Sequence, residues 1–151
     1  MLVAWLEYQR ATLLWKCERL DGDALVRRDV PPSTLSLLGI VRHMTVVEWS
    51  WFERVFTRSE QPSPIPLTDD RDADFNDLDA GRAMDDIEVF QRQCAASRRV
   101  VDATPSLDQV AASAKRPVSL RWIMIHMIEE YARHNGHADL LRERIDGAVG
   151  E

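Results

Sequence analysis

Residues 126–139 read HMIEEYARHNGHAD and carry three histidines and two glutamates among the apolar residues of a packed helix. Imidazole and carboxylate groups prefer water, and burying them without partners is costly. The same groups are ligands that Zn²⁺ and other divalent first-row metals prefer. The segment therefore raises the question of whether its polar side chains hold a metal ion.

A helix expected over 119–145 decides which of these side chains share a face. Its core-type seam follows steps of three and four: Ile123, Met127, Glu130, His134, His137 and Leu141. Glu130 and His134 are four residues apart, so their side chains meet on one face and can share one ion. His126 lies one turn before Glu130, but about 12 Å along the axis from His134.

His43 supplies a third candidate ligand from another expected helix, which ends near residue 57. Its neighbours three and four residues away are apolar or small: Gly39, Ile40, Val46 and Val47. His43 is therefore expected to point inward, with Gly39 leaving open space one turn away. We predict that His43 meets Glu130 and His134, because three protein ligands leave the open coordination position typical of catalytic metal sites.

Spacing leaves alternatives to this ligand set. His137 could replace Glu130 as the partner of His134, and His126 could pair with Glu130. An inward histidine is also common as a hydrogen-bonded core residue, and the pattern E-x-x-x-H occurs on solvated helix faces. His126 and His137 therefore stay open as ligands or as side chains that orient the ligands.

Other residues near the candidate ligands are expected to have smaller roles. Trp49, Trp51 and Trp122 are candidates for the wall of a substrate pocket, although buried tryptophan is more often plain core. Arg42 and Arg133 adjoin the ligands in sequence but point elsewhere on their helices. Solvent is their expected destination.

The whole sequence predicts an all-α fold, a single four-helix-bundle domain over 1–151 with long connections. The expected helices cover about 2–20, 34–57, 80–103 and 119–145. Ser33 or Thr34 is the expected N-cap of the second helix, and Gly147 ends the fourth. Between the second and third, 58–77 is expected to be a loop, because it holds three of the seven prolines and a run of acids.

Composition excludes several classes of partner. With 19 Lys and Arg against 25 Asp and Glu, the net charge is −6, which disfavours nucleic acid and anionic membranes. No stretch approaches the roughly 20 apolar residues that span a bilayer, and no signal peptide is visible. Cys17 and Cys94 lie far apart, so we expect no disulfide and a cytoplasmic location.

Motifs of other chemistries are missing. The sequence has no glycine-rich nucleotide loop and no G-x-S-x-G. A di-iron bundle needs Glu-x-x-His on two helices, and the fourth helix has none. Asp69, Asp70, Asp72 and Asp74 lack the glycine and terminal glutamate of a calcium-binding EF-hand, so they are expected to be solvated.

Two segments, LGIVRHMTVVEWSWF and VSLRWIMIHMIEEYARHNGHADLLRERIDG, resemble the DinB-like four-helix-bundle superfamily. Within it, the closer resemblance is to the branch of mycothiol-dependent S-transferase-like proteins, and it covers essentially the whole chain. The resemblance implies the helix order 1-2-4-3 and a homodimer.

The resemblance also implies a ligand set. In this superfamily one metal ligand is a histidine on helix two, which matches His43. The other two come from helix four at i, i+4, most often as H-x-x-x-H, which places them at Glu130 and His134. The glutamate departs from the commonest pattern but is also found in the mycothiol-dependent maleylpyruvate isomerase branch. His137 falls where many relatives carry glutamine, as a donor to a ligand.

The chemistry that follows is metal-dependent thiol transfer. The resemblance implies mycothiol or a similar thiol as co-substrate and an electrophilic small molecule as the other substrate. Zinc is the expected metal, with nickel, iron or manganese as alternatives. Two other functions stay open: a non-catalytic bundle that binds a metal or small molecule, and a structural or dimerisation module without metal.

Overall fold

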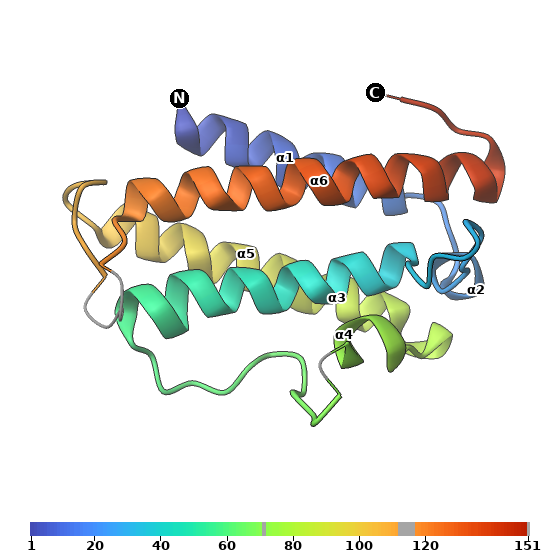
Figure 1. Ribbon diagram of the computed structural model, residues 1–151, viewed down its shortest axis with the longest axis horizontal. Coiled ribbons are helices and arrows are strands. Elements are labelled where there is room, and N and C mark those ends of the chain that lie inside the picture. Colours follow the sequence, from blue (N-terminus) through green and yellow to red (C-terminus); the bar gives the residue numbers. More distant parts are fainter. Residues whose placement is uncertain (71, 112–116, 151) are drawn as a thin grey trace.

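The computed structural model describes residues 1–70, 72–111 and 117–150, and its long elements are helices that lie lengthwise beside one another (Figure 1). These are α1 (Leu2–Cys17), α3 (Leu37–Glu48) with its continuation as the π-helix η1 (Trp49–Thr57), α5 (Ala83–Ala103) and α6 (Leu120–Asp146). Three short elements join them: α2 (Gly22–Leu25), α4 (Ala73–Asn76) and η2 (Ala80–Arg82). The predicted all-α class is confirmed.

The helices pair in a defined way. α1 packs mainly along α6, and α3 packs mainly along α5 and also contacts α6. α1 and α6 run in one direction while α3 and α5 run in the other, so the connection from 58 to 82 returns the chain along the bundle (Figure 1). The helix order 1-2-4-3 is not confirmed by these contacts. None of the helices in the described residues is long and apolar enough to cross a membrane.

Most predicted helix ends are confirmed to within a few residues. α6 starts at the predicted place because Ser119 Oγ accepts a hydrogen bond from Trp122 N at 3.2 Å, and it ends at Gly147 in the left-handed region with φ of 80°. The start of α3 is later than predicted, because Ser36, not Ser33 or Thr34, caps the helix through Gly39 N at 3.1 Å.

The predicted loop over 58–77 is wrong in its last part, where α4 forms. α4 docks on α3 at Gly39, where a Cβ atom would lie 3.3 Å from Phe75 Cδ1 and 3.4 Å from Phe75 Cα. The space expected beside Gly39 is therefore filled by Phe75. A glycine at this position lets a segment distant in sequence approach the first turn of α3 closely.

A buried charged cluster connects three of the long helices. Glu48 at the end of α3 is 0% exposed and accepts two hydrogen bonds from the Arg10 guanidinium of α1, both at 2.7 Å. It also accepts a hydrogen bond from the Tyr131 hydroxyl of α6 at 2.8 Å. Burial lowers the pKa of Arg10, but the adjacent Glu48 carboxylate outweighs burial and raises it, so the guanidinium stays charged.

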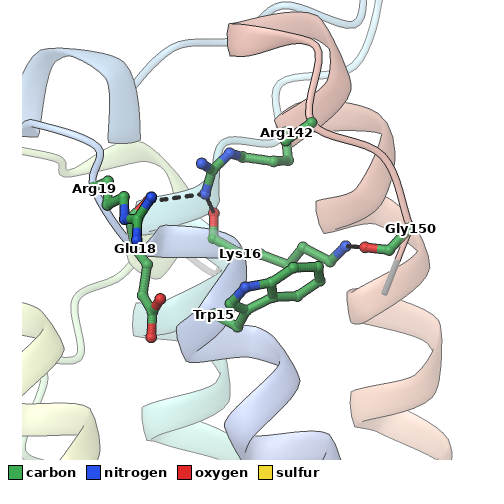
Figure 2. A pocket seen from close by; sticks show the side chains of 7 residues that line it. Trp15, Lys16, Glu18, Arg19, Arg142 and Gly150 are labelled. Carbon is green, nitrogen blue, oxygen red and sulfur yellow. Dashed lines mark hydrogen bonds between the residues drawn. The ribbon is translucent and has the colours of Figure 1, made fainter.

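The C-terminal ends of α1 and α6 form a second polar junction, beside a cavity of about 180 Å³ (Figure 2). Lys16 Nζ pairs with Asp139 and donates to the Gly150 carbonyl, while Arg142 donates to the carbonyls of Lys16 and Glu18 at 3.0 Å each. The charged groups of Lys16 and Arg142 are therefore both paired with oxygen atoms of the protein itself. The junction therefore fastens the chain end to the bundle.

The buried cluster predicts that neutralising Glu48 lowers the free energy of unfolding far more than neutralising an exposed glutamate. Glu48→Gln leaves the Arg10 charge buried without a counter-charge, so the free energy of unfolding should fall by about 3 kcal/mol. Glu88→Gln is the matched control, because Glu88 pairs with Arg92 on the surface and should cost under about 0.5 kcal/mol. Urea denaturation measures both changes, and equal stability of the two variants would contradict this role of Glu48.

Candidate metal centre

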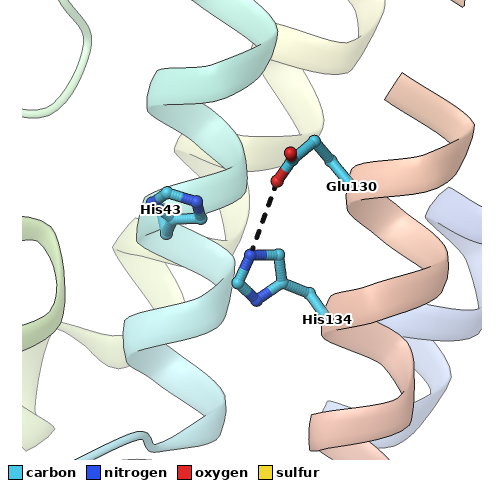
Figure 3. Close-up of side chains that lie close together, drawn as sticks. All are labelled: His43, Glu130 and His134. Carbon is cyan, nitrogen blue, oxygen red and sulfur yellow. Dashed lines mark ion pairs between the residues drawn. The ribbon is translucent and has the colours of Figure 1, made fainter. Parts of the chain in front are cut away.

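The three predicted ligands converge from α3 and α6. Among the described residues, His43, Glu130 and His134 each offer one ligand atom, and these atoms all lie within 4.8 Å of one another. The two imidazole rings have centroids 4.8 Å apart, and His134 Nε2 lies 3.8 Å from Glu130 Oε2 (Figure 3). Two imidazoles and one carboxylate are a donor set that suits a divalent metal with an open position.

Asp74 orients His43, and sequence reasoning missed it. Asp74 Oδ2 lies 2.8 Å from His43 Nδ1, and its side chain is only 14% exposed. Because an ionised carboxylate only accepts, Nδ1 donates this bond and Nε2 is left with a free lone pair. This carboxylate–histidine arrangement is typical of metal ligands. The expectation that Asp74 is solvated is wrong; an apolar Phe75 inside the acidic run was the signal that the segment docks.

Arg42 holds the segment that carries Asp74, and its predicted exposure is wrong. Its Nε donates to the Asp74 carbonyl at 3.3 Å, and its Nη1 pairs with Asp86 of α5 at 2.9 Å. Arg42 is 8% exposed. Phe75 of the same segment stacks on His43 with centroids 4.6 Å apart. α3, α4 and α5 together therefore fix the first ligand.

His134 is electrostatically suited to bind a cation. Burial, together with the neighbouring His43, His137 and Arg133, lowers the pKa of His134 to about 4, so the ring is neutral at pH 7. The nitrogen that faces Glu130 is Nε2, which lies 3.8 Å from Oε2. The other nitrogen, Nδ1, is buried and has no hydrogen-bond partner among the described residues. A neutral imidazole binds a cation through the ring nitrogen that carries no hydrogen.

The two alternative histidines lie at the edges of this cluster. His137 packs edge-on against His134 with centroids 5.5 Å apart, and its Nδ1 is also buried without a partner. His126 Nε2 lies 3.8 Å from Glu130 Oε1. Neither belongs to the group of three whose ligand atoms converge. Arg133 is 53% exposed, as expected, but it does not point away from the ligands, because its Nη1 pairs with Glu130 Oε1 at 3.3 Å.

Two of the three tryptophans predicted to wall a pocket lie beside the cluster. Trp51 and Trp122 contact each other and His126, with ring centroids 4.9 to 5.3 Å apart. Trp49 instead faces the connection that follows η1: its Nε1 donates to the Gln61 carbonyl at 3.2 Å, and Arg54 lies over its ring. Trp51 and Trp122 therefore stay candidates for the wall of a substrate pocket at this centre, and Trp49 lies elsewhere.

The protein's own thiols do not supply a nucleophile. Cys17 and Cys94 are both free and buried, as expected, and burial raises the pKa of each thiol to about 12. Because the thiolate is the reactive form, neither side chain is activated near neutral pH. Thiol chemistry at this centre needs a thiol from solution.

Comparison with known proteins identifies the family. A family model described as mycothiol S-transferase matches residues 1–147. The chain belongs to the mycothiol S-transferase family. No curated protein and no solved structure matches the chain. The family resemblance carried by the segments around His43 and Glu130 is therefore confirmed. The family description names mycothiol, which is a thiol from solution.

The contact between Asp74 and His43 predicts a role in metal affinity. Asp74→Asn keeps the shape of the side chain but removes its charge, so Zn²⁺ should bind about 10- to 100-fold more weakly. Asp69→Asn, an exposed change in the same acidic run, is the matched control and should leave the affinity unchanged. Competition with a chromophoric chelator measures both. Equal Zn²⁺ affinities of the two variants would exclude this role.

Proposed function

We propose that the protein is a metal-dependent mycothiol S-transferase in which His43, Glu130 and His134 hold a divalent ion, zinc in the first instance. The observation that carries the proposal is the convergence of three ligand atoms from α3 and α6, with Asp74 on the outer nitrogen of His43. A divalent ion bound there lowers the pKa of a coordinated thiol, so that sulfur is a thiolate at neutral pH.

The chain's own residues contribute orientation and charge. Glu130 would supply negative charge to a bound ion, and Asp74, which contacts Nδ1 of His43, would leave Nε2 of that ring to bind it. The buried His134 ring stays neutral at pH 7 and needs no deprotonation before binding. Three protein ligands leave a position for the thiol, as in other catalytic sites of this kind.

The reaction we propose is nucleophilic substitution at an electrophilic carbon. The thiol R–SH loses its proton to solvent, its sulfur forms a bond to carbon, and the leaving group X departs with the electron pair of the C–X bond. The products are the thioether R–S–R′, a proton and X⁻. The same thiolate can isomerise a suitable unsaturated substrate by addition and elimination.

A structural module without metal is disfavoured by the polar atoms at the centre. In a purely structural cluster, the histidines would satisfy one another by hydrogen bonds. Instead, the Nδ1 atoms of His134 and His137 are both buried and find no hydrogen-bond partner in the part of the chain that the structure describes. A non-catalytic metal-binding protein fits the same geometry, and turnover separates it from the transferase.

The homodimer and the cytoplasmic location stay predictions, as do the order of helices around the bundle and the small-molecule electrophile. Sedimentation velocity over a tenfold range of protein concentration tests the dimer. A single species at the monomer mass of 17.3 kDa would contradict it.

The proposal predicts metal-dependent turnover. Purified protein should catalyse conjugation of mycothiol to 1-chloro-2,4-dinitrobenzene, and a chelator should abolish the activity until Zn²⁺ is restored. Glu130→Ala should lower kcat/KM by at least about 100-fold, because even the loss of a residue that only supports a ligand costs 10- to 100-fold.

Glu143→Ala is the matched control for this variant. Glu143 lies in the last turn of the same helix, α6, and its side chain is exposed. Its replacement should change kcat/KM less than about twofold. Chelator-resistant activity would overturn metal dependence, and stoichiometric metal without turnover for any small thiol would favour the non-catalytic protein.

A further inference from the structure

Three aromatic rings form a contiguous cluster one helical turn from the candidate metal centre. Trp122 stacks on His126 with centroids 5.1 Å apart and planes at 16°, and Trp51 meets both rings from α3's continuation η1. We call Trp51, Trp122 and His126 the aromatic shelf. Trp122 is 45% exposed, so a large part of its ring surface stays open to a ligand.

The aromatic shelf is continuous with the metal centre. His126 Nε2 lies 3.8 Å from Glu130 Oε1, and Glu130 is one of the candidate ligands. Residues four apart on a helix are separated by about 6 Å along the axis. A substituent the length of one aromatic ring therefore bridges from a carbon at the metal centre to the shelf.

The π-helix explains how Trp51 joins the shelf. Residues 49–57 form η1, in which hydrogen bonds run from residue i to i+5 and each turn holds more residues than an α-helical turn. Trp51 therefore stays closer to the face of His43 and Val47 than a continued α-helix would place it. π-Helical turns are uncommon and recur at functional sites, so this is a second feature that singles out the shelf.

We propose that the aromatic shelf binds a flat, uncharged aromatic group of the electrophilic substrate. Ring stacking on an indole favours a planar π-system over a saturated ring of equal size. Glu129, whose Oε2 lies 3.6 Å from His126 Nδ1, disfavours an anionic aromatic. This inference rests on the proposed transferase function for its substrate but predicts binding whether or not turnover occurs.

Binding of a simple probe tests the shelf without catalysis. Fluorine NMR titration gives the affinities of fluorobenzene and fluorocyclohexane for the protein. Trp122→Ala should weaken fluorobenzene binding about three- to tenfold, which corresponds to the strength of one aromatic pair. Trp122→Phe keeps a ring and should retain most of the affinity, and fluorocyclohexane should bind weakly to all variants.

Trp5→Ala is the matched control, because Trp5 is a similarly exposed tryptophan, 54%, on α1. Its removal should leave fluorobenzene binding within twofold of the unaltered protein. Equal losses for Trp5→Ala and Trp122→Ala would overturn the proposal, and so would fluorocyclohexane binding as tightly as fluorobenzene.

A kinetic comparison distinguishes failure of the shelf from failure of the transferase function. With mycothiol, Trp122→Ala should raise KM for 1-chloro-2,4-dinitrobenzene about three- to tenfold, while iodoacetamide, which has no ring, should change less than twofold. Equal effects on both electrophiles would overturn the shelf and keep the transferase. If the unaltered protein turned over neither electrophile, the transferase function would be overturned. The fluorine NMR titration would then decide on its own whether the aromatic shelf binds aromatic groups.

Discussion

The carboxylate of Glu48 holds three helices at one buried point, and the candidate metal centre depends on that contact. Glu48 shares a helical run with His43, and its partner Tyr131 directly follows Glu130. A slide of α6 by one residue is about 1.5 Å, close to the length of a metal–ligand bond of about 2 Å. A fixed register between α3 and α6 is therefore a condition for ligands from both helices to reach one ion.

The centre is completed by a segment that is distant in sequence. α4 brings Asp74 to His43 and Phe75 onto its ring, while Arg42 ties α4 to α5. The connection from 58 to 82 is thus part of the site and not only a link between helices. Two buried ion pairs join these helices side to side: Arg10 with Glu48 between α1 and α3, and Arg42 with Asp86 between α3 and α5.

The helices and the ligand set were predicted from the sequence better than the residues that position the ligands. Seam spacing and the Gly147 cap located α6, and inward positions of His43, Glu130 and His134 followed from helical periodicity. Asp74 and Arg42 were missed, because their partners are long-range and the acidic, proline-rich run around Asp74 reads as solvated loop. The π-helix was missed too, since its apolar residues fit an α-helical pattern equally well.

The family and the convergence of three ligand atoms from α3 and α6 support the chemistry proposed above, thiol transfer at a bound divalent ion. The most direct measurement is anomalous diffraction at the metal absorption edge, from crystals of protein purified without a metal-affinity tag. The account predicts one peak bonded to a ring nitrogen of His43, a ring nitrogen of His134 and the carboxylate of Glu130. Crystals of metal-replete protein with no peak there, or with the peak on other residues, would contradict it.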